Sequence, residues 1–186
     1  MADQAQRRVP IVPSLEWLTG LPPAARFAFH GGAAARAALH PVWGVAFSEE
    51  ACRANTDSNR ATLWMGPDEY LLLEHASGGA STPALFDTLE RALDGVPHAL
   101  VDISHRQFAF EVAGPHAATI LRGACPLDLD LAQFPVGMCT RTVLAKADIT
   151  LWRTGADAFH LEVWRSFAGY VTGLLTEIAA EFHPSR

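Results

Sequence analysis

The sequence predicts an α+β fold made of two similar halves. Each half follows a βαβββα order, which gives antiparallel-rich sheets with helices on their faces. Short runs that alternate apolar and polar residues indicate half-buried strands, and runs with apolar residues at helical spacing indicate amphipathic helices. In addition, the pattern that begins at Phe27 recurs from Phe108. Strands combined with segregated helices are typical of α+β domains.

Residues 1–25 are predicted to form an extended N-terminal segment. Prolines interrupt it at positions 10, 13, 22 and 23, and a proline disfavours helix in the residue before it. Trp17 lies in this segment and is a candidate for the side chain that holds it to another surface.

The first half is predicted to span residues 26–97. An alternating strand around residues 27–29 precedes an Ala-rich helix, and a further strand covers residues 70–73. The half closes with a helix that has Thr82 as a candidate N-cap and Pro83 at its first position.

The second half is predicted to span residues 98–186. A strand over residues 107–112 ends at a Gly-Pro pair that opens a short helix, and Gly123 is placed to end that helix in a left-handed cap. A longer amphipathic helix closes the half. Within it, Gly169 and Gly173 lie four residues apart and would let another backbone approach closely.

Composition limits the classes of protein that this chain can represent. Charged residues make up 18% and apolar residues 49% of its 186 residues, and the net charge is −6. Lys146 is the only lysine and the arginines are scattered, so no nucleic-acid partner is expected. No apolar run approaches the roughly 20 residues that span a bilayer, so no membrane segment is expected either. The apolar excess therefore fills the core or a surface that a partner covers.

The cysteines and the N-terminus predict a cytoplasmic protein. Cys52, Cys125 and Cys139 show no CxxC spacing, which argues against a disulfide framework and against a zinc site built from cysteines. The first ten residues lack the apolar stretch of a secretory signal. We therefore expect three free thiols.

The sequence shows no complete set of catalytic or metal-binding residues. Asp102, Ser104 and His105 lie at one strand end, but neighbours on a strand face opposite sides, so Ser104 and His105 are not expected to share a proton. Asp102 and Ser104 are instead expected to bond locally at a bend. The histidines lack the spacing of metal ligands, and the glycines form no phosphate-binding loop. We expect no catalytic residue and no metal site.

Two groups of motifs resemble known families. The stretch VDISH at residues 101–105, followed by an alternating strand and a Gly-Pro-opened helix, resembles the glycine-cleavage T-protein (aminomethyltransferase) superfamily. The motifs DISHRQ, GACPLDL and LWRTGADAFHLEVWRSF, with the Phe-Pro-x-Gly turn at residues 134–137, resemble the gamma subunit of heterotetrameric sarcosine oxidase. This second resemblance covers roughly residues 64–181.

The resemblance implies a T-protein-like fold and a role without catalysis. The chain would be an assembly subunit of a complex that oxidatively demethylates sarcosine to glycine, a step of sarcosine catabolism and one-carbon metabolism. Its partners would be the alpha, beta and delta subunits, and FAD, FMN, NAD and tetrahydrofolate would be bound in those partners. Because the substrate is selected in other chains, the equivalent subunit of another N-methyl amino acid oxidase is an alternative.

A folate-binding, aminomethyltransferase-like protein that acts alone is a second alternative. T-protein-like enzymes carry a Gly-Gly turn followed by paired aspartates, one of which orients the transfer of the one-carbon unit. The matching stretch here, AKADITLW at residues 145–152, lacks the glycines and has one carboxylate, Asp148. Asp102 and Asp148 are the candidate folate-binding residues. The chain is also about half as long as those enzymes, which argues against this alternative.

Aromatic and arginine side chains are enriched at protein interfaces, because they combine a large apolar area with several donors. On this basis Trp152, Arg153, Trp164 and Arg165 are candidate interface residues. Trp17, as the candidate anchor of the N-terminal segment, and His105 and Arg106, which are expected to reach out from the strand end to a partner or to the sheet edge, are further candidates. Cation–π pairs within the fold would equally explain the two Trp-Arg pairs at 152–153 and 164–165. The apolar segment 124–138 is expected either to cover the core or to be covered by a partner.

Overall fold

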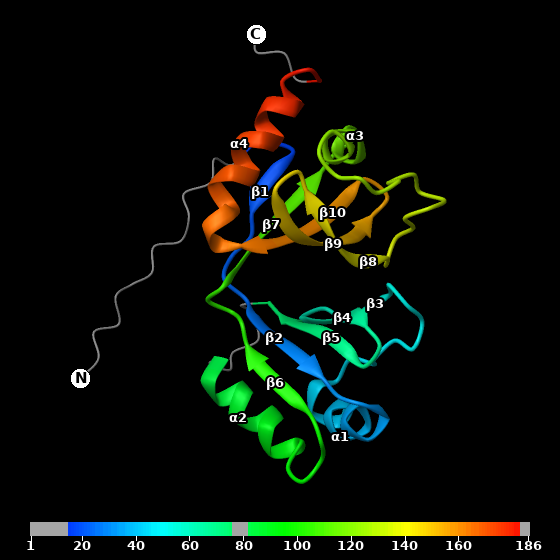
Figure 1. Ribbon diagram of the computed structural model, residues 1–186, viewed down its shortest axis with the longest axis vertical. Coiled ribbons are helices and arrows are strands. Elements are labelled where there is room, and N and C mark those ends of the chain that lie inside the picture. The colour runs from blue at the N-terminus through cyan, green and yellow to red at the C-terminus, as the bar shows by residue number, and fades with distance from the viewer. Residues whose placement is uncertain (1–14, 76–81, 183–186) are drawn as a thin grey trace, which may run out of the picture.

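The computed structural model describes residues 15–75 and 82–182. In this part of the chain two five-stranded antiparallel sheets face each other, and helices cover the outer face of each sheet (Figure 1). The layers therefore run helix, sheet, sheet, helix. This architecture confirms the predicted α+β class.

The first sheet and its helices occupy the first part of the chain. Their bounds are β2 (Ala25–His30), α1 (Ala33–Trp43), β3 (Ala54–Thr56), β4 (Arg60–Gly66), β5 (Glu69–Glu74), α2 (Thr82–Ala92) and β6 (Ala99–Asp102). The strand order is β3-β4-β5-β2-β6. Phe27 and Phe29 of β2 are fully buried against residues of both helices, as their alternation predicts. The predicted cap at Thr82 lies outside the described side chains.

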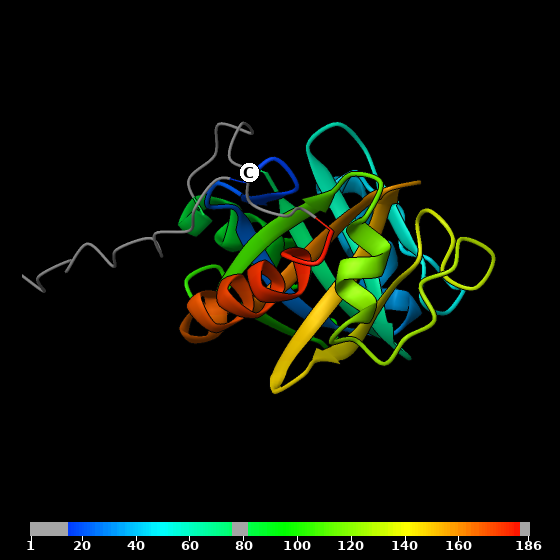
Figure 2. The same ribbon diagram turned by 90° about the horizontal axis from the view of Figure 1, so that it is seen from above.

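The second sheet repeats this plan. Its elements are β1 (Leu18–Gly20), β7 (Gln107–Ala113), α3 (Ala117–Arg122), β8 (Cys139–Leu144), β9 (Ala147–Gly155), β10 (Ala158–Trp164) and α4 (Ala168–Ala179). The strand order is β1-β7-β10-β9-β8. Helices α3 and α4 lie next to each other over this sheet (Figure 2). A single 3₁₀ turn, Arg165–Phe167, joins β10 to α4.

The two sheets share one strand order but exchange their outermost strands. Four strands of the first sheet, β3-β4-β5-β2, correspond to β8-β9-β10-β7 of the second, which confirms the prediction of two similar halves. However, β1 precedes β2 in the chain and pairs with β7, whereas β6 precedes β7 and pairs with β2. The predicted boundaries after residues 25 and 97 therefore stay a proposal. Each sheet contains one strand from the other side of such a boundary.

Three clusters of buried residues make up the core. Two of them lie between a sheet and its helices. The third lies between the sheets and consists of Ala61, Leu63, Leu71, Leu73, Ile103, Cys139 and Trp152. Because this middle cluster is small, much of the space between the sheets is available to polar side chains.

The role of Gly123, at the end of α3, differs from the predicted one. Gly123 has a φ of −60°, so the predicted left-handed cap is wrong. A side chain at this position would instead place its Cβ 2.8 Å from Ile178 of α4, so glycine is needed for the close packing of α3 on α4. By contrast, Gly169 and Gly173 of α4 face open space: apart from adjacent residues and the backbone of α4 itself, no described atom lies within 4 Å of the position that a Cβ would take at either residue.

Segment 124–138 covers the core, and two of its apolar side chains are exposed. Leu129 and Phe134 are buried against the second sheet. Leu131 and Val136 are about half exposed, with 49% and 50% of their surface accessible. Part of the segment thus packs on the core of this chain, which is one of the two predicted alternatives.

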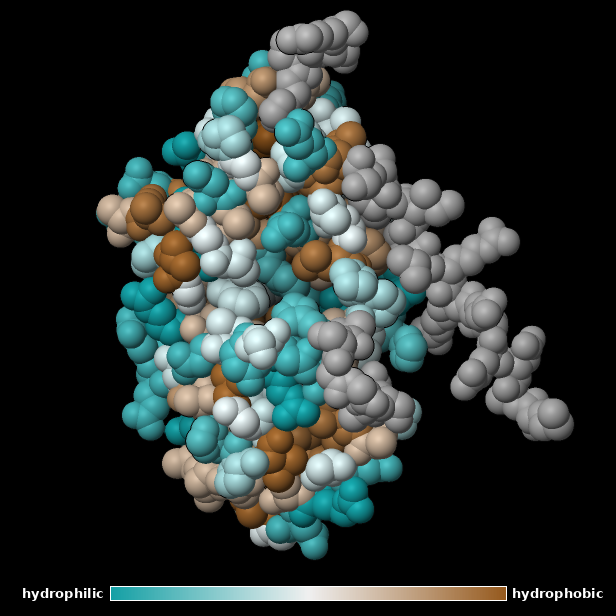
Figure 3. Space-filling model, turned by 180° about the vertical axis from the view of Figure 1, so that it is seen from behind, coloured by the Kyte–Doolittle hydropathy of each residue, from teal (hydrophilic) through white to brown (hydrophobic). Residues whose placement is uncertain are grey.

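Large apolar side chains are exposed at a few separate places. They are Val101, Leu131, Val136, Val143, Trp164, Phe167 and Tyr170. Figure 3 shows that apolar residues on the rear face form separate patches within a mixed polar surface. In the described part of the chain no helix is long and apolar enough to cross a membrane.

Burial of the Cys139 thiol predicts slow chemical modification. Burial between the sheets is the main cause that raises the pKa of this thiol to about 12. The thiolate is the reactive form, so at about pH 8 a disulfide reagent is expected to modify the partly exposed Cys52 first. A thiol titration of wild type and Cys52→Ser checks this, because the fast phase must disappear in the variant. A fast phase that persists would contradict it.

Candidate functional site

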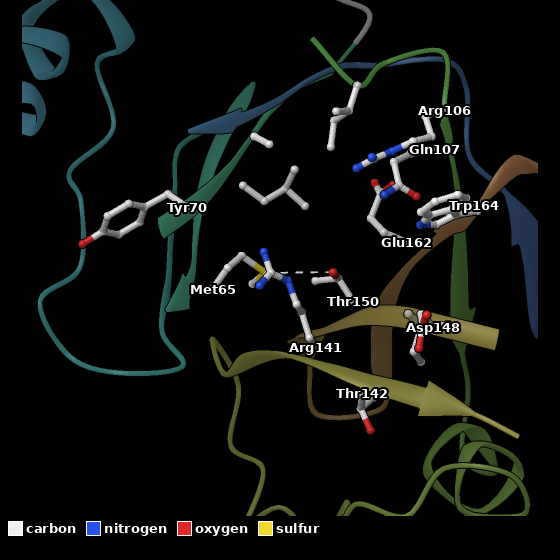
Figure 4. A pocket seen from close by; sticks show the side chains of 14 residues that line it. Met65, Tyr70, Arg106, Gln107, Arg141, Thr142, Asp148, Thr150, Glu162 and Trp164 are labelled. Carbon is white, nitrogen blue, oxygen red and sulfur yellow. Dashed lines mark hydrogen bonds between the residues drawn. The ribbon is translucent and has the colours of Figure 1, made fainter. Parts of the chain in front are cut away.

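A cavity between the two sheets is the main candidate for a functional site (Figure 4). Its volume is about 280 Å³. Both sheets contribute to its wall, which consists of Ala28, Met65, Tyr70, Leu71, Ile103, Arg106, Gln107, Arg141, Thr142, Asp148, Ile149, Thr150, Glu162 and Trp164. Arg106, Gln107, Glu162 and Trp164 gather on one side of it. The cavity is thus a mixed polar and apolar space at the junction of the two halves.

Three of the residues predicted from sequence meet at this cavity. Arg106, Asp148 and Trp164 line it, although they come from three different parts of the second half. The Arg106 guanidinium lies over the Trp164 ring, with its Cζ 5.0 Å from the ring centroid. Asp102 does not line the cavity, so the two folate candidates are not brought together.

Asp102 and Ser104 form a local turn, as predicted. One carboxylate oxygen of Asp102 accepts hydrogen bonds from the Ser104 backbone N–H at 2.9 Å and from the Ser104 hydroxyl at 2.6 Å. The Ser104 hydroxyl oxygen also accepts a bond from the Arg26 backbone N–H at 2.9 Å, which ties the turn to β2. His105 is exposed, and in the described residues no hydrogen bond joins it to Ser104. This arrangement has no nucleophile and base in series.

A buried ion pair crosses between the sheets beside the cavity. Arg26 of β2 donates from Nε to both carboxylate oxygens of Glu162 in β10, at 2.9 and 2.8 Å, and both side chains are almost fully buried. Nε2 of His160 lies 2.8 Å from Oε1 of the same carboxylate. Burial alone would raise the pKa of Glu162, but the hydrogen bond from His160 and the charge of Arg26 outweigh it and hold the pKa below its usual value of 4.5.

This ion pair predicts that stability is lost in acid. A carboxyl whose pKa is lower in the folded state contributes stability above its unfolded pKa, and that contribution disappears as the pH falls through the folded pKa. We therefore expect the free energy of unfolding to drop below about pH 4.5. Urea unfolding of wild type and Glu162→Gln between about pH 6 and pH 3 checks this. The difference between the two proteins must shrink towards acid, and a constant difference would count against the assignment.

The surroundings of His75 also lower its pKa. Burial lowers the pKa of His75, and the neighbouring charges of His160 and Arg26 lower it further, while Glu162 acts in the opposite sense. Its neutral form is thus favoured in the folded protein. Stability from this group is present above its ordinary pKa and is lost as the pH falls, which adds to the effect of Glu162.

The sequence predictions missed the polar residues between the sheets, namely Arg26, Glu162, His160, Gln107 and Arg141. A signal for two of them was present in the strand pattern. In β10 the residues Phe159, Leu161 and Val163 face the helices, so Glu162 must face the other sheet. The same alternation turns Arg26 of β2 away from its helices. Opposite charges at such positions in two stacked sheets indicate an ion pair between them.

The structure corrects the interface prediction for Trp152 and Arg153. Trp152 is 7% and Arg153 is 3% exposed. The Arg153 guanidinium lies 4.7 Å from the Phe159 ring centroid and donates to the carbonyl oxygens of Leu129, Phe134, Gly155 and Ala156. Both residues therefore stabilise this chain, which was the alternative explanation.

The remaining interface candidates differ in exposure. Trp17 is half-buried and packs against the core of the second sheet, so its side chain contacts this chain rather than a free surface. His105, Arg106 and Trp164 are exposed, and Arg165 is half-buried. These last four lie close together in the structure, because the Arg165 backbone N–H donates to the Arg106 carbonyl at 2.8 Å.

The structure does not bring together the two residues predicted to bind tetrahydrofolate. Asp148 is the only one of the two candidate carboxylates at the cavity. The volume of the cavity, about 280 Å³, lies near the lower limit of the roughly 300–1,000 Å³ of clefts that bury ligands of drug size. Within residues 15–75 and 82–182, no three His, Cys, Asp or Glu side chains are grouped as a metal site requires.

Comparison with known proteins identifies the family. The sarcosine oxidase, gamma subunit family matches residues 28–181. Sarcosine oxidase subunit gamma of Corynebacterium sp. (strain U-96) is 35% identical over 152 residues, which are 81% of this chain and 72% of the relative. Sarcosine oxidase subunit gamma of Arthrobacter sp is 32% identical over 152 residues, again 81% of this chain and 72% of the relative.

Solved structures agree with this result. A chain of heterotetrameric sarcosine oxidase from Corynebacterium sp. U-96, in complex with pyrrole 2-carboxylate, superposes with a TM-score of 0.82 at 30% identity and covers 94% of this chain and 90% of that chain. Aminomethyltransferase T of the glycine cleavage system from Bartonella henselae superposes with a TM-score of 0.64 at 16% identity over 85% of this chain and 44% of that chain. The second match confirms the T-protein-like fold. The chain belongs to the sarcosine oxidase gamma subunit family.

Proposed function

We propose that this chain is the gamma subunit of a heterotetrameric sarcosine oxidase and serves its assembly. The observation that carries the proposal is the extent of the structural match: the superposition with a chain of the solved oxidase covers 94% of this chain and 90% of that chain at a TM-score of 0.82. A chain that is similar over nearly all of its length to one member of an assembly is expected to occupy the same place in an equivalent assembly.

The geometry between the sheets supports a role without catalysis. Asp102 bonds to Ser104 at a turn, and Asp148 is the only one of the two candidate folate-binding carboxylates that lines the cavity. The buried carboxylate of Glu162 is neutralised by Arg26 and bonded to His160, so it is committed to the fold. We therefore place the oxidative demethylation of sarcosine to glycine in the alpha, beta and delta subunits, with FAD, FMN, NAD and tetrahydrofolate bound there in the cytoplasm.

Co-purification from the native host tests this proposal. The tagged chain is expected to bring larger chains with it and to show flavin absorbance near 450 nm, because the proposal places the flavins in the partners. Turnover of sarcosine by the recovered complex, compared with other N-methyl amino acids, then identifies the substrate. A colourless chain recovered alone would contradict the proposal.

A folate-binding protein that acts alone would behave differently. If that alternative were correct, the isolated chain would bind tetrahydrofolate, and Asp102→Ala or Asp148→Ala would abolish binding. We expect no binding by the isolated chain in a fluorescence titration, because the cavity is small and has one candidate carboxylate. Saturable binding that Asp148→Ala removes would favour the alternative.

A further inference from the structure

We propose that another subunit of the oxidase docks on the surface around Trp164, and that its docking segment presents a carboxylate there. We call the surface formed by Arg106, Trp164, Arg165, Phe167 and Tyr170 the Trp164 surface. The proposal rests on the proposed function, since it takes the partner to be a subunit of the same complex. Exposed aromatic rings, an open helix face, unpaired positive charge and unpartnered polar atoms point to this one surface.

The large aromatic side chains that are exposed in the described part of the chain are concentrated at the Trp164 surface. Trp164, Phe167 and Tyr170 are 48%, 38% and 39% exposed and lie within seven residues of one another. The rings of Phe167 and Tyr170 meet edge to face with centroids 6.2 Å apart. In the described part of the chain, the other large exposed apolar side chains are aliphatic. Tryptophan and tyrosine are the residues most enriched at the energetic centre of protein interfaces.

The outer face of α4 is open beside these rings. Gly169 and Gly173 flank Tyr170 on that face, and apart from adjacent residues and the backbone of α4 itself, no described atom lies within 4 Å of the position that a Cβ would take at either glycine. Glycine inside a helix is less favourable than alanine. Nothing in the described part of the chain requires glycine there. A partner backbone that approaches α4 closely would make use of the missing side chains, as the glycine spacing predicts.

The positive charge of the Trp164 surface indicates that the docking segment of the partner presents negative charge. Within the described residues neither Arg106 nor Arg165 forms an ion pair. By contrast, five arginines have carboxylate partners in this chain, namely Arg26, Arg36, Arg53, Arg60 and Arg141. Arg91, Arg122 and Arg153 also lack a carboxylate partner, but their guanidinium groups bond to carbonyl or hydroxyl oxygens. In the described residues neither Arg106 nor Arg165 forms a hydrogen bond from its side chain. Stacking on Trp164 holds the Arg106 guanidinium in place, and such a planar group binds a carboxylate through two parallel hydrogen bonds.

Unpartnered polar atoms lie at the same place. In the described residues three buried side-chain polar atoms have no hydrogen-bond partner, and two of them are Oε1 of Gln107 and Nε of Arg165. Gln107 is directly opposite Trp164 in the β7–β10 ladder, and Arg165 follows Trp164 in the chain. Buried polar groups in folded proteins nearly always have partners. Because both atoms are buried in this chain, a docking segment would supply these partners only after the side chains of Gln107 and Arg165 move.

Co-expression with the other subunits tests the surface. Wild type, Trp164→Ala and Arg106→Glu are each tagged, and the flavin recovered per tagged chain is measured. We expect each variant to associate about thirty-fold more weakly than wild type, which is the effect of an interfacial hot spot. Both substituted side chains are exposed, so the variants are expected to keep the fold, and circular dichroism with thermal unfolding verifies this.

Val136→Ser is the matched control. Val136 is as exposed as Trp164, but it lies in segment 124–138, which both ribbon views place on the side of the second sheet away from the start of α4 (Figures 1 and 2). It is expected to associate like wild type. If wild type recovers flavin and all three variants do so equally, the docking surface is wrong while the proposed function stands. If wild type recovers none, the proposed function itself fails.

Hydrogen exchange of the wild-type chain gives a test that does not depend on variants. Backbone amides of residues 164–174 are expected to exchange more slowly in the purified complex than in the isolated chain, because the partner covers them. Amides of residues 131–136 serve as the internal reference and are expected to be unchanged. Protection of 131–136 without protection of 164–174 would move the docking surface to the other side and overturn the proposal.

Discussion

Replacing Glu162 by alanine is expected to lower the free energy of unfolding by about 3–5 kcal/mol. The carboxylate is 1% exposed and receives two hydrogen bonds from Arg26, which is 3% exposed. Its removal leaves the Arg26 charge in a space of low dielectric without a partner. Breaking a buried ion pair from one side is costly for this reason. Urea unfolding followed by tryptophan fluorescence measures the change.

A second ion pair between the sheets provides the control. Arg141 of β8 binds Glu69 of β5, but the two side chains are 55% and 35% exposed. The Arg141 guanidinium holds the pKa of Glu69 below its usual range, yet exposed pairs of this kind contribute about 1 kcal/mol or less. Glu69→Ala is therefore expected to have a small effect. Equal losses in Glu162→Ala and Glu69→Ala would show that burial is not the cause.

The double variant separates the charge from the packing. If the cost of Glu162→Ala comes from the unpaired charge, Arg26→Met combined with Glu162→Leu is expected to be more stable than either single change. Pairs of buried charges are often replaced by apolar residues at little cost, and residues in contact give non-additive changes. A strictly additive loss would contradict the explanation.

Arg153→Met is expected to cost about 3–4 kcal/mol. The Arg153 guanidinium donates to the Leu129 and Phe134 carbonyl oxygens at 3.1 and 2.8 Å, and these bonds are buried. Methionine fills similar space but leaves both carbonyl groups without this donor, and each buried unsatisfied group costs roughly 1–3 kcal/mol. Thermal unfolding of the purified variant measures the loss.

Two further substitutions show which property of Arg153 causes the loss of stability. Arg153→Lys keeps the charge but loses the planar fork of donors, so we expect it to recover only part of the stability. Arg122→Met on the exposed face of α3 removes an arginine whose guanidinium bonds to the Thr119 hydroxyl, and it is expected to change stability by less than about 0.5 kcal/mol. A loss in Arg153→Lys as small as that in Arg122→Met would mean that the bonds to segment 124–138 contribute little.

The fold was predictable because periodicity is a local property. Alternation in β2 and β7 and helical spacing in α1 to α4 can be read within a dozen residues, and the repeat of these patterns predicts two similar halves. The function of Gly123 was not predictable in this way. Its neighbour Ile178 is far away in the sequence, so a local rule suggested a cap where the structure needs close packing.

The site was predictable only in part, because it depends on how the sheets face each other. Sequence reasoning selected Arg106, Asp148 and Trp164, which do meet at the cavity. It also selected Arg153, an arginine beside a tryptophan, on the same chemical grounds as Arg106. Strand position separates the two: Arg153 is inside β9 and buried, whereas Arg106 precedes β7 and is exposed. Exposure of a given arginine follows from strand bounds that sequence patterns locate poorly.

The exchange of β1 and β6 makes the two halves inseparable as folding units. A polypeptide that ended at residue 97 would lack the outer strand β6 of its own sheet, and one that began at residue 98 would lack β1. Each would expose a row of backbone donors and acceptors that the intact chain pairs, which invites aggregation. The subunit is therefore expected to melt in one cooperative transition, and neither half can be transplanted as an independent module.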